Sequence, residues 1–304
     1  MKHTFDDIRA FLKVVDSGGI SAAAIHLGVS KSSISARIQR LERSLHAELL
    51  HRSPRGVALT NAGRLFHTRM RDVAALMQQA IDDVAGGRGD GLSGGLRIAA
   101  PMTFGTMYLG PILFNFMAGH PDIEVTLELD DRFVDILADG YDLAVRIGRL
   151  SDSSLKARRI GPSPRVLCCS PAYAARHGVP ASVESIRDHP CICYGNASAA
   201  SFWEFKAPAA KGEALYVAVR GRTHLNNGES MRDAAIAGLG LAILPRFIAQ
   251  PALQNGRLQI VMPETPPTED SIYVLYPPTR YISRAVRVLT DTFVDFFEDP
   301  EWAP

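Results

Sequence analysis

A glycine turn between two short helical patterns constrains this chain more than any other feature of its sequence. Ser21 can cap a helix over residues 22–27, and Gly28 can end that helix in the left-handed conformation. Ser30 can cap a second helix over residues 31–45. The apolar residues that share one face of this second helix are Ile34, Ile38, Leu41 and Leu45. Two helices joined in this way predict a helix–turn–helix, whose second helix enters the major groove of DNA.

The outward face of the second helix carries small and polar side chains, which leave room for the edges of bases. We predict that the DNA contacts of this helix come from Ser30, Lys31, Ser32, Ser33, Ser35, Ala36, Arg37, Gln39 and Arg40. The following residues 51–60 are typical of a turn leading into a short strand, with Arg52 and Arg55 at the tip. A basic hairpin of this kind, a wing, suits contact with phosphates or the minor groove.

Positive charge is concentrated around these helices. Residues 30–71 contain nine Lys or Arg and two Asp or Glu side chains, a net charge of +7, whereas the whole chain carries only +1. The alternative interpretation is a solvated helical face, which is what most charge runs are. DNA binding is favoured here because the caps, the turn, the apolar stripe and the charge all agree.

A long helix is predicted after the wing, over residues 62–85. Its apolar residues recur at spacings of three and four from Leu65 to Val84. A helix beside a small domain cannot bury so wide a stripe alone, so we expect it to pair with the same helix of a second subunit. Packing on its own domain is the alternative. The glycine-rich residues 86–95 predict a flexible hinge.

The pattern then changes to alternating strands and helices. The first set places strands at 96–100, 123–129 and 142–148, with a short helix at 132–138, which predicts a parallel sheet. A second set places strands at 166–170, 191–194, 216–221 and 241–245. Pro-rich segments at 161–164 and 265–268 bracket this second set. They predict two lobes joined by two crossings, with a ligand bound between the lobes.

Candidate ligand contacts follow from the rule that open α/β sheets bind ligands beyond the carboxyl ends of their strands. After the strand at 96–100 come Pro101, Met102, Thr103 and Phe104, and Asn226 precedes a later helix. Arg146 could pair with a carboxylate, and Phe202 with Trp203 could form an apolar wall. Thr103 and Asn226 could instead be caps only, and Arg146 could pair with Asp142. The predicted ligand is small, with an anionic or strongly polar end.

The sequence SAAAIHLGVSKSSISARIQRLE, followed by LLHR and ALTNAG, resembles the N-terminal winged helix of LysR-type transcriptional regulators. The resemblance continues through DGYDLAVRIGRL, CSPAYAARHGVP and NNGESMRDAAIAGLGLAILP to the closing helix, so it covers essentially the whole chain. The chain departs from it at three positions, because the family commonly has glycine at His46, phenylalanine at Leu50 and arginine at Ala36.

The resemblance implies an N-terminal all-α winged helix–turn–helix with a long linker helix, followed by a two-lobed α/β effector domain like periplasmic binding proteins. The expected limits are 1–61 for the DNA-binding domain, 62–93 for the linker helix and hinge, and 94–304 for the effector domain. Within the effector domain, lobe I takes about 94–162 and 268–304, and lobe II about 163–267. The resemblance also implies a homodimer that assembles into a homotetramer on an inverted-repeat operator in double-stranded DNA.

The remaining residues predict no cofactor or metal. Cys168, Cys169, Cys191 and Cys193 fit neither zinc-ligand spacing nor a disulfide framework, so buried thiols are predicted, with a thiol sensor as the alternative. The sequence has no nucleophile elbow, metalloprotease motif or Walker loop. An enzyme is therefore not predicted, although an enzyme fused to a DNA-binding module and a nucleoid-shaping protein remain alternatives. A secretory signal and a membrane span are not expected either, which predicts a cytoplasmic, nucleoid-associated protein.

Overall fold

The computed structural model describes residues 3–53, 56–85, 91–132, 134–150, 155–195, 202–207, 214–277, 282–298 and 300. The chain forms two compact units, one mainly of residues 1–90 and one mainly of residues 91–278 and 285–304. Within the described ranges, no helix combines the length and apolar character that crossing a bilayer requires.

Three helices and a hairpin open the N-terminal unit: α1 (Phe5–Asp16), α2 (Ile20–His26), α3 (Lys31–Leu45), β1 (Leu50–Ser53) and β2 (Gly56–Leu59). Phe11, Ile34 and Ile38 are fully buried in the core that the three helices share. The predicted bounds of the second helix are confirmed, because the Ser30 hydroxyl accepts the Ser33 backbone N–H at 3.1 Å. The predicted start of the first helix is wrong: α2 begins at Ile20, with Gly19 as its N-cap instead of Ser21.

Two residues in the left-handed region set the turns around α3. Gly28, with φ +61°, lies in the turn between α2 and α3, as predicted. His46, with φ +51°, follows the last residue of α3. A residue with a Cβ adopts this conformation at a cost of roughly 1–2 kcal/mol, whereas glycine adopts it freely. This accounts for the glycine that the family resemblance places at position 46.

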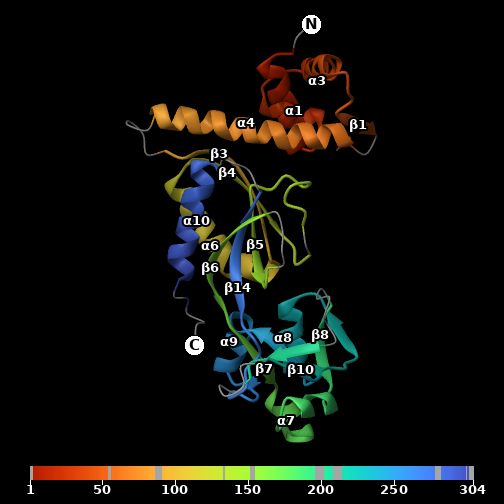
Figure 1. Cartoon of the computed structure of the whole chain (residues 1–304), viewed down its shortest axis with the longest axis vertical. Coiled ribbons are helices and arrows are strands. Elements are labelled where there is room, and N and C mark those ends of the chain that lie inside the picture. Colours follow the sequence, from red (N-terminus) through yellow and green to blue (C-terminus); the bar gives the residue numbers. More distant parts are fainter. Residues whose placement is uncertain are drawn as a thin grey trace. The chain divides into compact units, whose positions relative to one another are not determined.

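The hairpin of β1 and β2 is anchored at its base. The Glu42 carboxylate of α3 accepts the backbone N–H groups of Leu49 at 2.8 Å and Leu50 at 3.2 Å. The Thr60 backbone N–H donates to the Leu49 carbonyl at 3.0 Å, and the Thr60 hydroxyl accepts the Gly63 N–H at 2.9 Å. These bonds fix the predicted wing between α3 and the next helix, α4 (Asn61–Ala85), which is one unbroken helix (Figure 1).

The second unit contains two five-stranded sheets (Figure 1). The first sheet has the order β4-β3-β5-β14-β6, in which β3 is parallel to β4 and β5, while β14 is antiparallel to β5 and β6. Its strands are β3 (Ser93–Ala100), β4 (Asp122–Leu129), β5 (Leu143–Gly148), β6 (Lys156–Ser163) and β14 (Asp270–Tyr276). Its helical segments are α5 (Met102–Phe104), the π-helical turn Gly105–Leu109, α6 (Gly110–Gly119) and α10 (Arg284–Phe297). We call this part lobe I.

The second sheet has the order β11-β8-β12-β7-β13 and forms lobe II. Its strands are β7 (Arg165–Cys169), β8 (Cys191–Tyr194), β11 (Thr223–Leu225), β12 (Leu241–Pro245) and β13 (Gln259–Ile260). Its helical segments are α7 (Pro171–His177), the 3₁₀ turn Glu184–Asp188, α8 (Gly228–Ile236) and α9 (Arg246–Gln254). An antiparallel hairpin of β9 (Phe202–Phe205) and β10 (Leu215–Ala218) packs on its core through Trp203, Phe205 and Val217.

Three predictions for this unit are corrected. Residues 136–140 form turns, so the predicted helix at 132–138 is wrong. The strand predicted at 216–221 is β10, which pairs with β9, and the short β11 takes the place in the sheet. The edge strand β6 was not predicted. The two predicted crossings are confirmed, since the chain leaves lobe I between β6 and β7 and returns before β14.

Candidate functional site

The start of α3 presents a surface of small polar side chains. Ser30, Lys31, Ser32, Ala36 and Gln39 are exposed, and three further predicted contacts are half-buried: Ser33, Ser35 and Arg37. The Ser30 and Ser32 hydroxyl oxygens lie 2.8 Å apart. Ser32, Ser33, Ser35 and Ala36 in the first two turns are small, so a duplex groove can approach the α3 backbone closely beside them.

Arg40, also predicted to contact DNA, is half-buried and has a second partner. Its Nε lies 3.6 Å from Oδ1 of Asp7, whose side chain is only 1% exposed. The Asp7 carboxylate also accepts the Thr4 backbone N–H at 2.8 Å, at the start of α1. Arg40 therefore links α3 to α1.

Of the two predicted wing arginines, the structure describes only the backbone of Arg52. Arg52 belongs to β1, but its side chain lies outside the described residues, as does the whole of Arg55. At the base of the wing, the Arg64 guanidinium donates to the Leu59 carbonyl at 3.1 Å and to the Asn61 side chain. One cation is thus fixed where the wing meets α4.

Helix α4 leaves large apolar side chains in contact with solvent. Leu65 is 64% exposed, Val73 42%, and Leu76 and Met77 41% each. At 100° per residue these four fall within about a third of the helix circumference. Such a stripe on a helix of 25 residues is what a symmetric helix pair buries.

The predicted ligand contacts of lobe I lie where β3 passes into α5. Pro101 is partly exposed and Met102 is 45% exposed, whereas Thr103 is only 4% exposed. The Thr103 hydroxyl has no hydrogen-bond partner among the described residues. A buried hydroxyl without a partner is costly, so this oxygen is a strong candidate for a ligand contact.

Phe104, the fourth of these residues, belongs to an aromatic core. Its side chain is fully buried, and its ring centroid lies 5.6 Å from that of Phe247 and 5.1 Å from that of Phe297. Phe247 comes from α9 of lobe II, so this cluster joins the two lobes. The ring of Phe104 is buried in this cluster and offers no accessible surface to a ligand.

Asp131 is a functional candidate that the sequence reasoning missed. Its Oδ1 accepts the Met102 backbone N–H at 2.9 Å, and its Oδ2 lies 3.4 Å from Nδ2 of Asn227. Met102 belongs to lobe I, and Asn227 is the N-cap of α8 in lobe II. Asp131 follows the carboxyl end of β4, which is next to β3 in the sheet. The strand-end rule applied to β4 would have identified this residue.

Arg146 lies on β5, and its environment combines burial with nearby acids. Burial lowers the pKa of the Arg146 guanidinium, while Asp130, Tyr141, Asp131 and Tyr194 act in the opposite direction. Tyr194 ends β8 of lobe II, so Arg146 interacts electrostatically with both lobes. The Arg132 guanidinium holds the pKa of Asp130 below its usual value through hydrogen bonds.

The lobe II candidates are more exposed. Asn226 follows β11 and is exposed, while its neighbour Asn227 caps α8 by accepting the Ser230 N–H at 3.0 Å. Phe202 on β9 is 59% exposed, whereas Trp203 is 9% exposed and packs in the lobe II core. Of the predicted aromatic wall, only Phe202 has surface that a ligand can reach.

The four cysteines are buried in β7 and β8, as predicted. Burial raises the pKa of Cys168 and Cys191 to about 12 and that of Cys169 to about 11. It also raises the pKa of Cys193. Because the thiolate is the reactive form, these thiols are poor nucleophiles near neutral pH.

Two family models together account for nearly all of the chain. The model of the bacterial regulatory helix-turn-helix protein, lysR family, matches residues 5–64. The model of the LysR substrate binding domain matches residues 89–298, more than half of the chain. The chain belongs to the LysR family of transcriptional regulators. As a LysR-type regulator, it is a DNA-binding protein with an effector-binding domain.

Characterised and uncharacterised relatives extend over most of this LysR-type regulator. The probable regulator LtrA of Klebsiella pneumoniae is 33% identical over 258 residues, which are 85% of this chain and 82% of LtrA. The transcriptional activator AaeR of Escherichia coli is 30% identical over 287 residues, 94% of this chain and 92% of AaeR. Both names describe regulators of transcription, which agrees with the prediction that the chain is not an enzyme.

Full-length LysR-type structures share the fold. The virulence activator AphB of Vibrio cholerae matches with a TM-score of 0.57 and 28% identity, covering 97% of this chain and 99% of AphB. CrgA of Neisseria meningitidis matches with a TM-score of 0.58 and 25% identity, covering 97% and 99%. The predicted fold class, a winged helix–turn–helix with a two-lobed α/β effector domain, is confirmed.

Proposed function

We propose that this LysR-type regulator responds to a small effector with an anionic or strongly polar end, bound between lobes I and II. The observation that carries the proposal is the buried Thr103 hydroxyl without a partner among the described residues. The proposed contacts are Pro101, Met102 and Thr103, with Phe104 beneath them, together with Arg146, Phe202 and Asn226. Arg146 supplies positive charge, Asn226 an amide and Phe202 an apolar surface.

Asp131 restricts which effectors fit this site. It already accepts the Met102 N–H, so an effector carboxylate that uses the same donor must displace it. An effector that binds beside Asp131 instead needs a hydrogen-bond donor facing the carboxylate. In either case the contact between Asp131 and Asn227 changes, and with it the link between the lobes. The effector shifts the regulator between arrangements only by its preference for one of them.

On the DNA side, we propose that α3 lies in a major groove and the wing contacts phosphates. The proposed contacts are Ser30, Lys31, Ser32, Ser33, Ser35, Ala36, Arg37, Gln39 and Arg40 from α3, with Arg52 and Arg55 from the wing. The α4 stripes of two subunits pair, so that two α3 helices meet an inverted-repeat operator, and two dimers form a tetramer. The proposed limits are 1–61, 62–93 and 94–304, and the proposed location is the cytoplasm, beside the nucleoid.

Thiol sensing is the second candidate for the signal. The AphB regulatory domain of Vibrio vulnificus, 26% identical over 67% of this chain, has been solved after treatment with cumene hydroperoxide. In the present chain all four thiols are buried, and burial raises the pKa of each. This environment disfavours the thiolate that peroxide attacks. The small-effector proposal is therefore the better supported one.

Replacing Thr103 by Val will weaken effector binding by about 10- to 100-fold, the range expected for losing a hydrogen bond to a charged group. The probes are a panel of small carboxylates, phosphates and amino acids, screened by thermal shift on the full chain and then measured by calorimetry. Thr103→Ser is the matched control and retains binding, while Thr103→Val melts no lower than the wild type. Unchanged affinity in Thr103→Val, or binding of uncharged apolar compounds alone, would contradict the proposal.

A further inference from the structure

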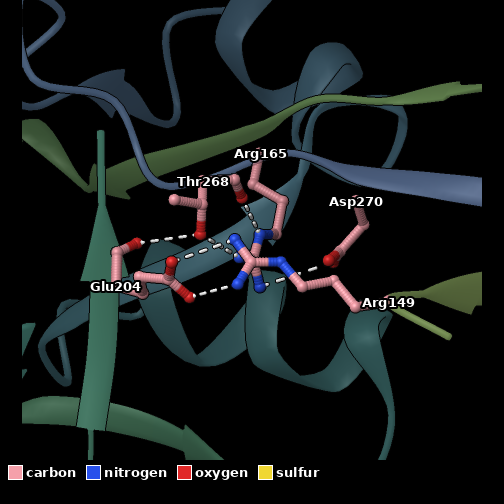
Figure 2. A network of polar contacts seen from close by, with 5 residues as sticks. All are labelled: Arg149, Arg165, Glu204, Thr268 and Asp270. Carbon is pink, nitrogen blue, oxygen red and sulfur yellow. Dashed lines mark hydrogen bonds and ion pairs between the residues drawn. The ribbon is translucent and has the colours of Figure 1, made fainter. Parts of the chain in front are cut away.

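An ion pair joins the two lobes close in sequence to two of the proposed effector contacts, three residues after Arg146 and two residues after Phe202. Arg149 Nη1 donates to Glu204 Oε2 at 2.7 Å, and Nη2 donates to Oε1 at 3.0 Å (Figure 2). Arg149 directly follows β5 of lobe I, and Glu204 lies on β9 of the lobe II hairpin. The Glu204 side chain is 20% exposed, so this bidentate pair is partly shielded from water. Paired parallel bonds of this kind fix orientation as well as distance.

Glu204 is held firmly in place on its own side. Its backbone carbonyl accepts the Thr268 N–H at 3.1 Å and the Thr268 hydroxyl at 3.3 Å. The next residue, Phe205, forms an antiparallel bridge with Pro267 and is fully buried. The hairpin strand is thus tied to the second crossing between the lobes, and Glu204 cannot follow Arg149 if lobe I turns away.

The two crossings are themselves bound to each other (Figure 2). Arg165, at the start of β7, donates from Nε to the Thr268 carbonyl at 2.7 Å and from Nη2 to the Thr268 hydroxyl at 3.0 Å. Its Nη1 lies 3.4 Å from Oδ2 of Asp270, the first residue of β14. These contacts join residues within the crossings and so hold the axis about which the lobes would turn. The Arg149–Glu204 pair belongs to the same network (Figure 2) and adds a direct link between a strand end of one lobe and the hairpin of the other.

The same hairpin face also carries aromatic side chains. Tyr216 of β10 is the cross-strand partner of Glu204, and Phe202 lies two residues before Glu204. Cross-strand partners and residues two apart share one face of a hairpin. Phe202 and Tyr216 are 59% and 66% exposed, whereas Trp203 and Val217, on the opposite face, are buried. Arg149, which pairs with Glu204, therefore also fixes the position of Phe202 on this face.

We propose that the Arg149–Glu204 ion pair is a latch between the lobes, and that Arg149 is a positioning residue for the hairpin face that carries Phe202. When the pair is formed, it adds a link at the hairpin to those at the crossings, at Asp131–Asn227 and at the Phe104–Phe247 cluster. When it breaks, the lobes turn about the crossings tied by Arg165, and the hairpin moves relative to β5. The role assigned to Phe202 rests on the proposed effector site, whereas the latch itself does not.

The latch is tested by measuring the distance between the lobes in the full chain without effector or DNA. Spin labels are placed on Asn115→Cys in α6 and Ala172→Cys in α7, two exposed positions, and pulsed electron resonance gives the distance distribution. Because the four native cysteines are buried, labelling is confined to the introduced ones. Labelled protein is mixed with an excess of unlabelled protein, so that distances between subunits do not contribute.

Arg149→Glu and Glu204→Arg will each increase the population with separated lobes by at least tenfold. The milder Glu204→Gln will give an intermediate shift if either charge reversal fails to fold. Arg158→Glu, which breaks the Arg158–Asp291 pair within lobe I, is the matched control and leaves the distribution unchanged. An unchanged distribution in the Arg149 and Glu204 variants would overturn the latch. Because no effector is present, failure of the latch is distinct from failure of the proposed effector site.

Discussion

Replacing Leu76 by Glu will break the proposed α4-paired dimer and lower the affinity for operator DNA by at least about 100-fold. Leu76 is 41% exposed and belongs to the α4 stripe with Leu65, Val73 and Met77. In a symmetric pair the same residue enters the interface twice, so one substitution buries two like charges. Each buried carboxylate without a partner costs several kcal/mol, more than a helix pair can offset.

The Leu76 experiment uses sedimentation velocity for the oligomeric state and fluorescence anisotropy for DNA affinity at a fixed salt concentration. The matched control is Phe296→Glu, which places the same charge on an exposed apolar side chain of α10. This control keeps the α4-paired dimer and its DNA affinity. A dimeric Leu76→Glu variant with wild-type affinity would show that the stripe packs within its own subunit, which is the alternative considered for this helix.

Replacing Gly63 by Ala, which adds one methyl group, will lower the free energy of unfolding of the DNA-binding unit by about 3 kcal/mol. This value is at the upper end of the range for overpacking a core. A Cβ at this position would lie 2.0 Å from the Leu49 carbonyl oxygen and 3.1 Å from Cδ2 of Leu59. The carbonyl cannot retreat without losing the Thr60 N–H that it accepts, and the base of the wing would open. Operator binding will fall with it, because the wing and α3 share this base.

Thermal melting of Gly63→Ala checks this expectation, since 3 kcal/mol corresponds to a fall of more than about 12 °C for a unit of this size. Gly119→Ala is the control, because a Cβ there meets nothing within 4 Å. The control melts like the wild type and binds DNA normally. If Gly63→Ala melts within 2 °C of the wild type and keeps its DNA affinity, the packing described at the wing base is wrong.

Local sequence signals predicted the bounds of an element correctly where a cap, an apolar stripe and a terminating residue agreed. The bounds of α3 and β12 follow directly from Ser30, the apolar spacing and the flanking glycine and proline residues. The helix predicted at 132–138 is wrong: Ile136 packs in the lobe I core with Ala99 and Tyr141, and its carbonyl accepts the Tyr141 N–H at 3.0 Å in a turn. The strand β6 was not predicted because its charged residues and Pro162 are not typical of a strand. An edge strand tolerates such residues.

The pairing of strands that are distant in the sequence could not be predicted from local patterns. The segment at 216–221 has the stronger strand pattern, but β10 finds its partner in β9, and the weaker β11 joins the sheet. The effector candidates Thr103 and Arg146 followed from the ends of their strands. Asp131 also follows the end of its strand, β4, but was not predicted, whereas the importance of Tyr194 and Glu204 depends on contacts between the lobes. No local pattern of residue types encodes those contacts.

The central claim is that α3 reads DNA. It is tested most directly with the Ser32→Glu variant, whose affinity is measured for operator DNA. This operator DNA is first recovered genome-wide with the wild-type protein. Ser32 is exposed at the start of α3, where an acidic residue favours the helix and repels phosphate. We expect the oligomeric state and melting temperature of the wild type, with at least 100-fold weaker operator binding. Wild-type operator affinity in Ser32→Glu would contradict it.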